Sequence, residues 1–155
     1  MSTLDSLASS VLTKAEKRGA SQAEAFILDS HIRSIYIEDG TPRLADDKLE
    51  RGLGIKACIH KRIGFSSGVI SNTKSTEEIV SEALSIAKTT KEDPDFQSLP
   101  SGGEVSGEIK DVFCEETAEI RTEEIVAKAM TIVKAAEKNE RVKVPLGLLR
   151  LAKYS

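Results

Sequence analysis

Apolar residues recur at steps of three and four in three segments of the chain, the spacing that gathers them on one side of an α-helix. Gly19 is predicted to close the first helix in the left-handed conformation. Ser75 and Glu78 have the spacing of a capping box at the start of the second helix, which should end before Asp93. Thr122 is predicted to cap the third helix. The three apolar stripes consist of Leu4, Leu7, Ala8, Val11, Leu12 and Ala15, of Ile79, Val80, Ala83, Leu84 and Ala87, and of Ile125, Val126, Ala129, Ile132, Val133 and Ala136.

Shorter runs rich in β-branched and apolar residues predict strands. The polar residues Asp29–His31 are expected to form the tight turn of a hairpin between the first two strands. The segment Thr41–Lys48 contains Pro42 and two adjacent acidic residues, and it is expected to be a loop. Because Pro145 has no amide hydrogen for strand pairing, the last predicted strand can lie only at an edge or an end of the sheet. The predicted strands are Glu24–Leu28, Ile32–Ile37, Gly52–His60, Ile63–Ile70 and Arg141–Val144.

These elements predict an α+β fold with an antiparallel sheet of four to five strands and three helices, in the order α-β-β-β-β-α-α-β. A length of 155 residues is typical of one domain. Since the chain contains no tryptophan, Ile, Val, Leu and Ala are expected to form the core, with Phe26, Phe65 and Phe113 as its large fillers. The polar stretch 90–108 is expected to be a long surface loop.

Charge and hydropathy exclude several classes of function. The net charge is −3, and Lys and Arg are spread along the chain instead of forming the basic patch that nucleic acids require, so no nucleic-acid partner is expected. No apolar run approaches the ~18 residues of a membrane span, and the amino terminus lacks the features of a signal peptide. A cytoplasmic protein without membrane contact is therefore predicted. Cys58 and Cys114 lie far apart, and we expect both to be reduced, buried thiols.

Candidate metal ligands are few, because the chain has only two histidines. Cys58 and His60 lie two residues apart on a predicted strand, so their side chains could share a metal on one face. Zinc sites usually need at least three protein ligands. The fold would have to supply the others from Cys114 and the carboxylate of Glu50 or Asp111, which the spacing does not predict. We therefore expect a half-exposed histidine beside a strand cysteine, and neither a metal nor a cofactor in this chain.

A serine nucleophile is the other chemistry to consider, because Ser66 or Ser67 could meet His60 across the predicted hairpin. We interpret Gly64–Gly68 as small residues in a tight strand, and not as the nucleophile elbow of hydrolases. The pair Gly52–Gly54 lacks the third glycine of a phosphate-binding fingerprint. No catalytic or cofactor-binding residue is therefore predicted.

The segment Glu50–Phe65 reads as a glycine-leucine-glycine strand, a basic turn, and then glycine-phenylalanine on the returning strand. This pattern resembles the amino-terminal domain of TldD/PmbA proteins, also called modulators of DNA gyrase. Other parts agree in order, so that the resemblance covers roughly residues 4–144, with 145–155 as a truncated continuation or tail. The positions that match the family pattern are Glu24 at a strand opening, Asp39 and Gly40 at a strand end, Gly52, Gly54, Gly64 and Phe65 in the hairpin, and Pro100 at the end of the loop Asp93–Pro100.

The resemblance implies a connection with proteolysis, but no catalytic residue in this chain. In the family, two related subunits form a protease complex, and the TldD-type subunit holds zinc through a histidine-glutamate motif on a helix. This chain has no such motif. Complete members are about three times longer than this chain, which looks like a truncated member, an excised domain or a short gene product. Its Leu-Pro loop is closer to the PmbA-type branch.

The function expected from the resemblance is that of a non-catalytic domain of a metallopeptidase complex subunit. It would contribute to subunit assembly or to the enclosure of an unfolded peptide. Its partner would be a TldD/PmbA-type subunit or the remainder of the full-length protein. The alternative is a stand-alone interaction module without a protease role, a homodimer that covers its edge strand with a second copy. A DNA-related role is disfavoured by the dispersed charge.

Overall fold

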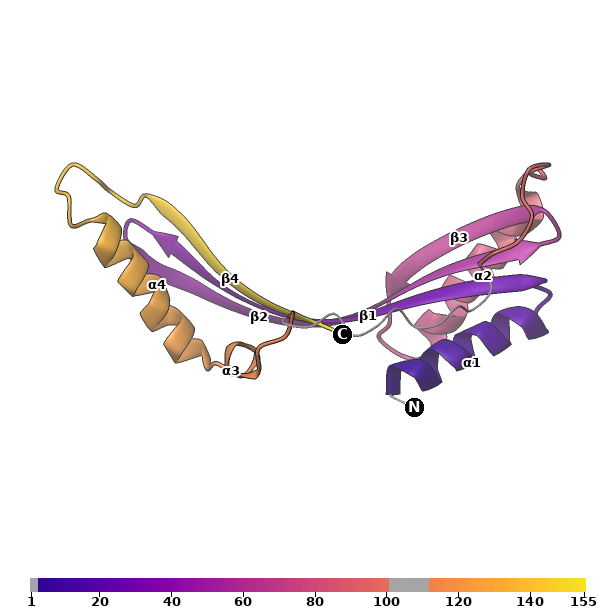
Figure 1. Ribbon diagram of the computed structural model, residues 1–155, viewed down its shortest axis with the longest axis horizontal. Coiled ribbons are helices and arrows are strands. Elements are labelled where there is room, and N and C mark those ends of the chain that lie inside the picture. Colours follow the sequence, from indigo (N-terminus) through magenta and orange to yellow (C-terminus); the bar gives the residue numbers. More distant parts are fainter. Residues whose placement is uncertain (1–2, 101–111) are drawn as a thin grey trace. The chain divides into compact units, whose positions relative to one another are not determined.

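The computed structural model describes residues 3–100 and 112–155, and it confirms the predicted α+β class. Four strands form one antiparallel sheet in the order β3-β2-β1-β4 (Figure 1). The chain divides into two compact units, unit 1 with residues 1–29 and 50–106 and unit 2 with residues 30–49 and 107–155. The elements are α1 (Thr3–Lys17), β1 (Gln22–Glu38), β2 (Thr41–Ile59), β3 (Arg62–Val69), α2 (Thr73–Thr89), α3 (Glu115–Ala118), α4 (Thr122–Ala136) and β4 (Leu146–Tyr154).

Unit 1 packs α1 and α2 against one face of the sheet that β1, β2 and β3 form there (Figure 1). The predicted apolar stripes of both helices supply its core, as the helical spacing requires. Gly19, with φ +106°, lies just beyond the end of α1 in the predicted left-handed conformation. The buried core residues are Val11, Ala15, Leu53, Ile55, Ala57, Ile79, Val80, Ala83 and Leu84.

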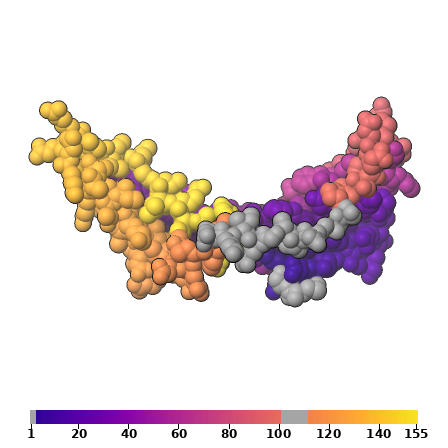
Figure 2. Space-filling view, in the orientation of Figure 1, coloured from indigo at the N-terminus to yellow at the C-terminus, as the bar shows by residue number. Residues whose placement is uncertain are grey.

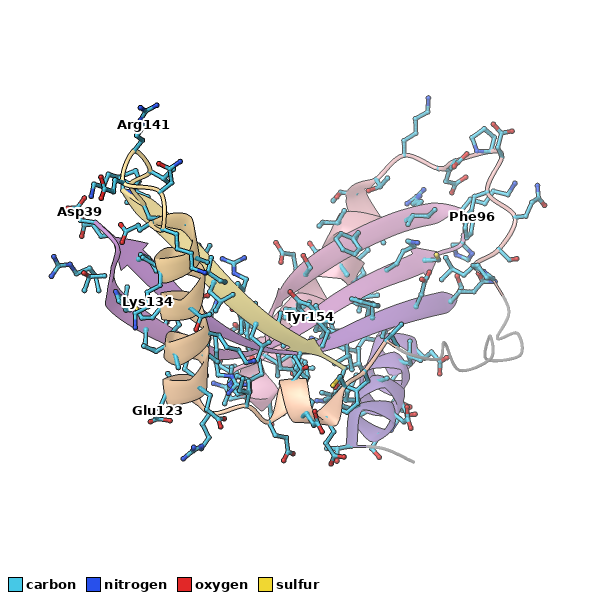
Figure 3. All side chains as sticks on the ribbon, turned by 60° about the vertical axis from the view of Figure 1, so that its left-hand side comes forward. Asp39, Phe96, Glu123, Lys134, Arg141 and Tyr154 are labelled. Atoms are coloured by element: carbon cyan, nitrogen blue, oxygen red, sulfur yellow. The ribbon has the colours of Figure 1, made fainter. Side chains whose placement is uncertain are left out.

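Unit 2 packs α4 against one face of its part of the sheet. Figure 3 shows α4 beside the strands, with Glu123 in its first turn and Lys134 in its last. On the helix side of the sheet, Ile35 of β1 lies opposite Leu149 of β4. The core of this unit consists of Ile35, Ile37, Ile125, Ala129 and Val133, with Leu149 and Leu151 packed against it.

The turn Asp39–Gly40 joins β1 to β2. Both residues have positive φ values, 46° and 67°, as the two-residue turn of a tight β-hairpin requires. Their N–H groups donate to the carbonyls of Pro145 and Val144 at 2.9 and 2.8 Å. The segment that leads into β4 is thereby held against the hairpin turn, and the predicted strand end at Asp39–Gly40 is confirmed.

The predicted hairpin within residues 24–37 is wrong, because β1 runs without interruption through Asp29–His31. Two polar side chains in this stretch have partners on β2. The Asp29 carboxylate accepts from the Arg51 guanidinium, and the His31 ring lies 2.6 Å from Asp47 Oδ1. The predicted loop Thr41–Lys48 is likewise wrong, since it is the first half of β2. Cross-strand ion pairs therefore keep polar residues inside strands that their composition argued against.

Three other local predictions are corrected. The strand predicted at Arg141–Val144 is wrong, and the strand begins after Pro145 instead, at Leu146. The N-cap of α2 is Asn72 and not Ser75, because Asn72 Oδ1 accepts from the Ser75 N–H at 2.9 Å and Ser75 Oγ accepts from the Asn72 N–H at 3.1 Å. Thr122 is the first residue of α4 and not its cap.

The predicted aromatic core fillers are also wrong, since Phe26, Phe65 and Phe113 are 66%, 56% and 59% exposed. The predicted surface loop has no helix or strand over residues 90–100, and its remainder, 101–108, lies outside the described residues. Phe96, labelled in Figure 3, belongs to this loop. None of the helices in the described ranges is long and apolar enough to cross a membrane.

Candidate functional site

The described residues among those considered for metal binding do not form a site. Cys58 is fully buried near the end of β2, and its burial raises the pKa of its thiol. His60 is exposed in the β2–β3 turn with φ 54°, so it does not share a strand face with Cys58 as predicted. Cys114 belongs to unit 2, and Asp111 lies outside the described residues. Among residues 3–100 and 112–155, no three His, Cys, Asp or Glu side chains are grouped closely enough to hold a metal.

The serine considered as a nucleophile lies beneath α2. The segment Gly64–Gly68 does match the spacing G-x-S-x-G letter for letter, with Ser66 at its centre. A nucleophile elbow, however, places its serine on a sharp turn between a strand and a helix. Ser66 instead lies inside β3, is 5% exposed, and donates to Glu82 Oε2 at 2.7 Å. Its hydroxyl therefore joins strand to helix.

Cys114 lines a cavity of about 430 Å³ in unit 2, where it is exposed and not buried as predicted. It precedes α3, and hydrogen bonding from Thr117 lowers the pKa of its thiol. At the rim, the Lys153 ammonium lies 5.2 Å from the centre of the Phe113 ring, a cation–π distance. Arg33 donates to the carbonyls of Ala118 and Ile120, which fixes the chain after α3 to β1.

The glycines of the family pattern lie in the β2–β3 hairpin. A Cβ added at Gly64 would be 2.0 Å from the Ala83 carbonyl oxygen, so α2 approaches the strand at a distance that only glycine allows. Gly54 lies beside the Phe65 ring, 3.5 Å from a Cβ built on it. Gly52 pairs with Val69 in the ladder. These glycines therefore set the distance of α2 on one face and give the phenylalanine ring room on the other.

The two remaining positions of the pattern are Glu24 on β1 and Pro100 in the loop after α2. The Glu24 carboxylate forms an ion pair of 3.2 Å with Lys56 on the neighbouring strand. Pro100 is exposed at the end of the described loop. The preceding residue, Leu99, donates its N–H to Gln22 Oε1 at 2.7 Å. The loop after α2 is thus tied back to the start of β1.

Unit 1 exposes an apolar surface, the aromatic face, on the side of its sheet that no described helix covers. It consists of Phe26, Phe65 and Val69, which are 66%, 56% and 51% exposed. Their strand neighbours Ala25, Ile27, Gly64 and Ser66 face the helices, so alternation places these three side chains on the opposite side. Sequence reasoning placed Phe26 and Phe65 in the core, because periodicity cannot tell which face of a strand is covered.

Unit 2 has a comparable surface, the leucine face, on the side of its sheet away from α4. It consists of Tyr36, Leu44, Leu146 and Leu148, which are 38%, 58%, 77% and 52% exposed. Tyr36 lies directly opposite Leu148 in the β1–β4 ladder. These side chains line an open groove of about 610 Å³. The sequence signal was the alternation of Leu146, Leu148 and Arg150 with Leu149 and Leu151.

The chain has the fold of three larger proteins of known structure. It is similar to TldE from Thermococcus kodakarensis, with a TM-score of 0.75 at 19% identity over 95% of this chain and 34% of that one. A proposed modulator of a DNA gyrase from Thermotoga maritima gives 0.70 at 18% identity, over 99% and 35% of the two chains. A proposed modulator of DNA gyrase from Bacteroides thetaiotaomicron gives 0.74 at 15% identity, over 97% and 39%. The chain thus spans little more than a third of the length of these relatives.

Sequence comparison agrees with the fold. No curated protein sequence matches the chain. Residues 23–87 match the model of PmbA/TldA metallopeptidase domain 1, and this range holds β1, β2, β3 and most of α2. It includes every glycine of the hairpin pattern. The resemblance predicted from the sequence is therefore confirmed over residues 23–87, which match a first domain of the PmbA/TldA metallopeptidase family.

Proposed function

We propose that this chain acts as a non-catalytic first domain of a PmbA/TldD-type metallopeptidase assembly, and that it binds the rest of the assembly through its aromatic face. The observation that carries the proposal is the exposure of Phe26, Phe65 and Val69 on a sheet face that no described helix covers. Burying a side chain of this size contributes about 1.5–3 kcal/mol. Large apolar side chains exposed on the same face of a sheet are typical of an interface.

The relatives support an assembly role. The matched family model is a domain 1, and the relatives of similar fold extend well beyond the length of this chain. Further polypeptide, either in the same chain or in a partner subunit of the family, would therefore be available to cover the aromatic face. We place this assembly in the cytoplasm, where the free thiols Cys58 and Cys114 would remain reduced.

The proposal assigns the metallopeptidase chemistry to another part of the assembly. Within the described ranges, no three possible metal ligands are grouped together around Cys58 or elsewhere. The Ser66 hydroxyl donates a hydrogen bond to Glu82. The chain would instead contribute walls to the space in which a peptide is enclosed. Zinc content and casein hydrolysis of the pure chain, measured with and without added zinc, test this assignment. We expect neither bound zinc nor turnover, and zinc-dependent hydrolysis by the pure chain would refute it.

The assembly surface is tested by charge substitution on the aromatic face. Co-expression with a PmbA/TldD-type subunit from the same organism is expected to give a complex that co-elutes in size-exclusion chromatography. The double variant Phe26→Glu, Phe65→Glu should abolish co-elution. Phe113→Glu is the matched control, since Phe113 is 59% exposed but lies in unit 2. Co-elution that survives the double variant would show that another surface mediates assembly.

A further inference from the structure

We propose that the outer edge of β4 binds an extended acidic peptide from another polypeptide, which adds a strand to the sheet of unit 2. The inference rests on the proposed role in peptide enclosure and names both the recognising element and the class of peptide. It uses a surface separate from the aromatic face.

The first argument is the unpaired backbone of β4. All nine residues from Leu146 to Tyr154 pair with β1, in a register that runs from Glu38 to Ser30. β4 is the last strand in the sheet order, and no other described strand lies beside it. One side of β4 therefore presents its backbone N–H and C=O groups to solvent or to a further strand. Its atoms, drawn yellow, form part of the surface in Figure 2.

The second argument is the contrast with the other edge of unit 2. There, β2 carries Pro42, Asp46 and Asp47, and proline and charged side chains are features that proteins use to prevent a strand from adding to an edge. Residues 146–154 contain no proline and no acidic residue. The β4 edge lacks the proline and the acidic residues of the β2 edge, and its own charges, Arg150 and Lys153, would repel a basic strand but not an acidic one.

The third argument is the leucine face beside this edge. A strand that pairs with β4 would place alternate side chains next to Leu146 and Leu148, which are 77% and 52% exposed. These leucines also line the groove of about 610 Å³ that reaches Tyr36 and Leu44. Apolar residues at alternate positions of the peptide would therefore be buried on this face.

The fourth argument is charge, which identifies the occupant. β4 carries Arg150 and Lys153 without an acidic residue, although the chain as a whole has a net charge of −3. A second copy is disfavoured, because antiparallel pairing of β4 along most of its length places Arg150 opposite or diagonal to its own copy. Arg150 shares the leucine face with Leu146 and Leu148, and Lys153 lies on the other face. Acidic residues beside this half of β4 would meet one cation on each face. A peptide with apolar residues in the half beside Leu146 and Leu148 and acidic residues in the half beside Arg150 and Lys153 satisfies all four observations.

The experiment uses fluorescein-labelled peptides of the length of β4, nine residues, and measures binding by anisotropy. The first peptide has valines in one half and glutamates in the other, the second has lysines in place of the glutamates, and the third is the glutamate peptide with N-methyl groups that prevent backbone pairing. The glutamate peptide is expected to bind at least about tenfold more tightly than either of the others. Equal affinity of the glutamate and lysine peptides, or no effect of N-methylation, would overturn the proposal.

Two aspartate variants locate the site. Leu146→Asp should weaken binding of the glutamate peptide by about tenfold. Leu49→Asp is matched in charge and exposure, since both leucines are 77% exposed, but it lies on β2. It should leave binding unchanged, and equal losses in the two variants would contradict a site at β4. Arg150→Glu should reverse the preference between the glutamate and lysine peptides.

The same measurements separate this inference from its alternatives. A dimer seen in sedimentation that Leu146→Asp dissociates would show that a second copy occupies the edge, and the proposal would fail. Phe26→Glu, Phe65→Glu should keep peptide affinity while losing co-elution with the partner subunit. Loss of peptide binding in this double variant would refute a separate site at β4. Co-elution without any peptide binding would refute the β4 inference and leave the proposed function intact.

Discussion

The contact between Gly64 and α2 allows a quantitative prediction. In Gly64→Ala, the new Cβ would lie 2.0 Å from the Ala83 carbonyl oxygen and 2.4 Å from the Ala87 nitrogen. Both are backbone atoms of α2, so no side-chain rotation can relieve the overlap. Since ordinary van der Waals contact begins at 3.4 Å, the helix would have to retreat by about 1.4 Å, the difference between 3.4 and 2.0.

A shift of this size disturbs the core of unit 1, because Ile79, Val80 and Leu84 of α2 are all buried in it. Extra volume in a well-packed core typically costs about 1–3 kcal/mol. A rigid backbone clash belongs at the upper end, and we expect Gly64→Ala to lower the free energy of unfolding by about 3 kcal/mol. A loss of this size is smaller than the ~5–15 kcal/mol of a typical domain, so the variant should still fold.

Urea unfolding followed by far-ultraviolet circular dichroism measures this loss, since the chain has no tryptophan for fluorescence. Gly54→Ala is the matched control, because its Cβ would meet only the Phe65 ring at 3.5 Å, an ordinary contact. We expect the control to change the free energy of unfolding by less than about 0.5 kcal/mol. If the two variants are equally stable, the helix does not lie against β3 as described.

Three further predictions concern local features. Asn72→Ala removes the N-cap of α2 and should lower the free energy of unfolding in urea by about 1 kcal/mol. Thr73→Ala should lower it less, because it is Asn72 Oδ1 that accepts from the Ser75 N–H. Equal losses in the two variants would contradict the cap. The hydrogen bonds from Arg51 lower the pKa of Asp29. The stability that this pair contributes is therefore fully present above about pH 4 and is lost as the pH falls through the lowered pKa. Arg51→Met should flatten this dependence of stability on acid pH, and an unchanged dependence would count against the pair. Iodoacetamide at about pH 8 should label the exposed Cys114, whose pKa is lowered, much faster than the buried Cys58, whose pKa is raised. Mass spectrometry measures the two labelling rates, and faster labelling of Cys58 without denaturant would contradict the prediction.

The helices and the β2–β3 hairpin could be predicted from the sequence because their signals are local. The stripe from Ile79 to Ala87 follows the helical repeat, and both predicted ends of α2 lie within a few residues of Thr73 and Thr89. The alternation of Leu53, Ile55 and Ala57 likewise identifies the buried side of β2. In these segments, the residues that face the core are sufficient to define the element.

The continuous β1 strand could not be predicted in this way, because its polar residues are compatible with a strand only through distant partners. Asp29 interacts with Arg51, and His31 with Asp47. The residues from Asp29 to His31 therefore have the composition of a turn, although Asp29 and His31 pair with side chains on the neighbouring strand β2.

The exposed faces could not be predicted for a similar reason. An alternating strand presents apolar residues to both sides, and only the positions of the helices decide which side is covered. Phe65 and Ser66 are adjacent in β3, yet the phenylalanine is 56% exposed and the serine 5%. The family pattern in the hairpin was readable because its glycines are unusual in a strand, but their packing against Ala83 and Phe65 required the structure.

The central claim is that the aromatic face contacts a PmbA/TldD-type polypeptide, and photo-cross-linking in cells that naturally produce the protein tests it most directly. Benzoylphenylalanine would replace Phe65 or, as a matched control, Phe113, which are 56% and 59% exposed. We predict a cross-link from position 65, and not from position 113, to a polypeptide that mass spectrometry identifies as a PmbA/TldD-type chain. No such cross-link at position 65, or an equal yield at both positions, would contradict the claim.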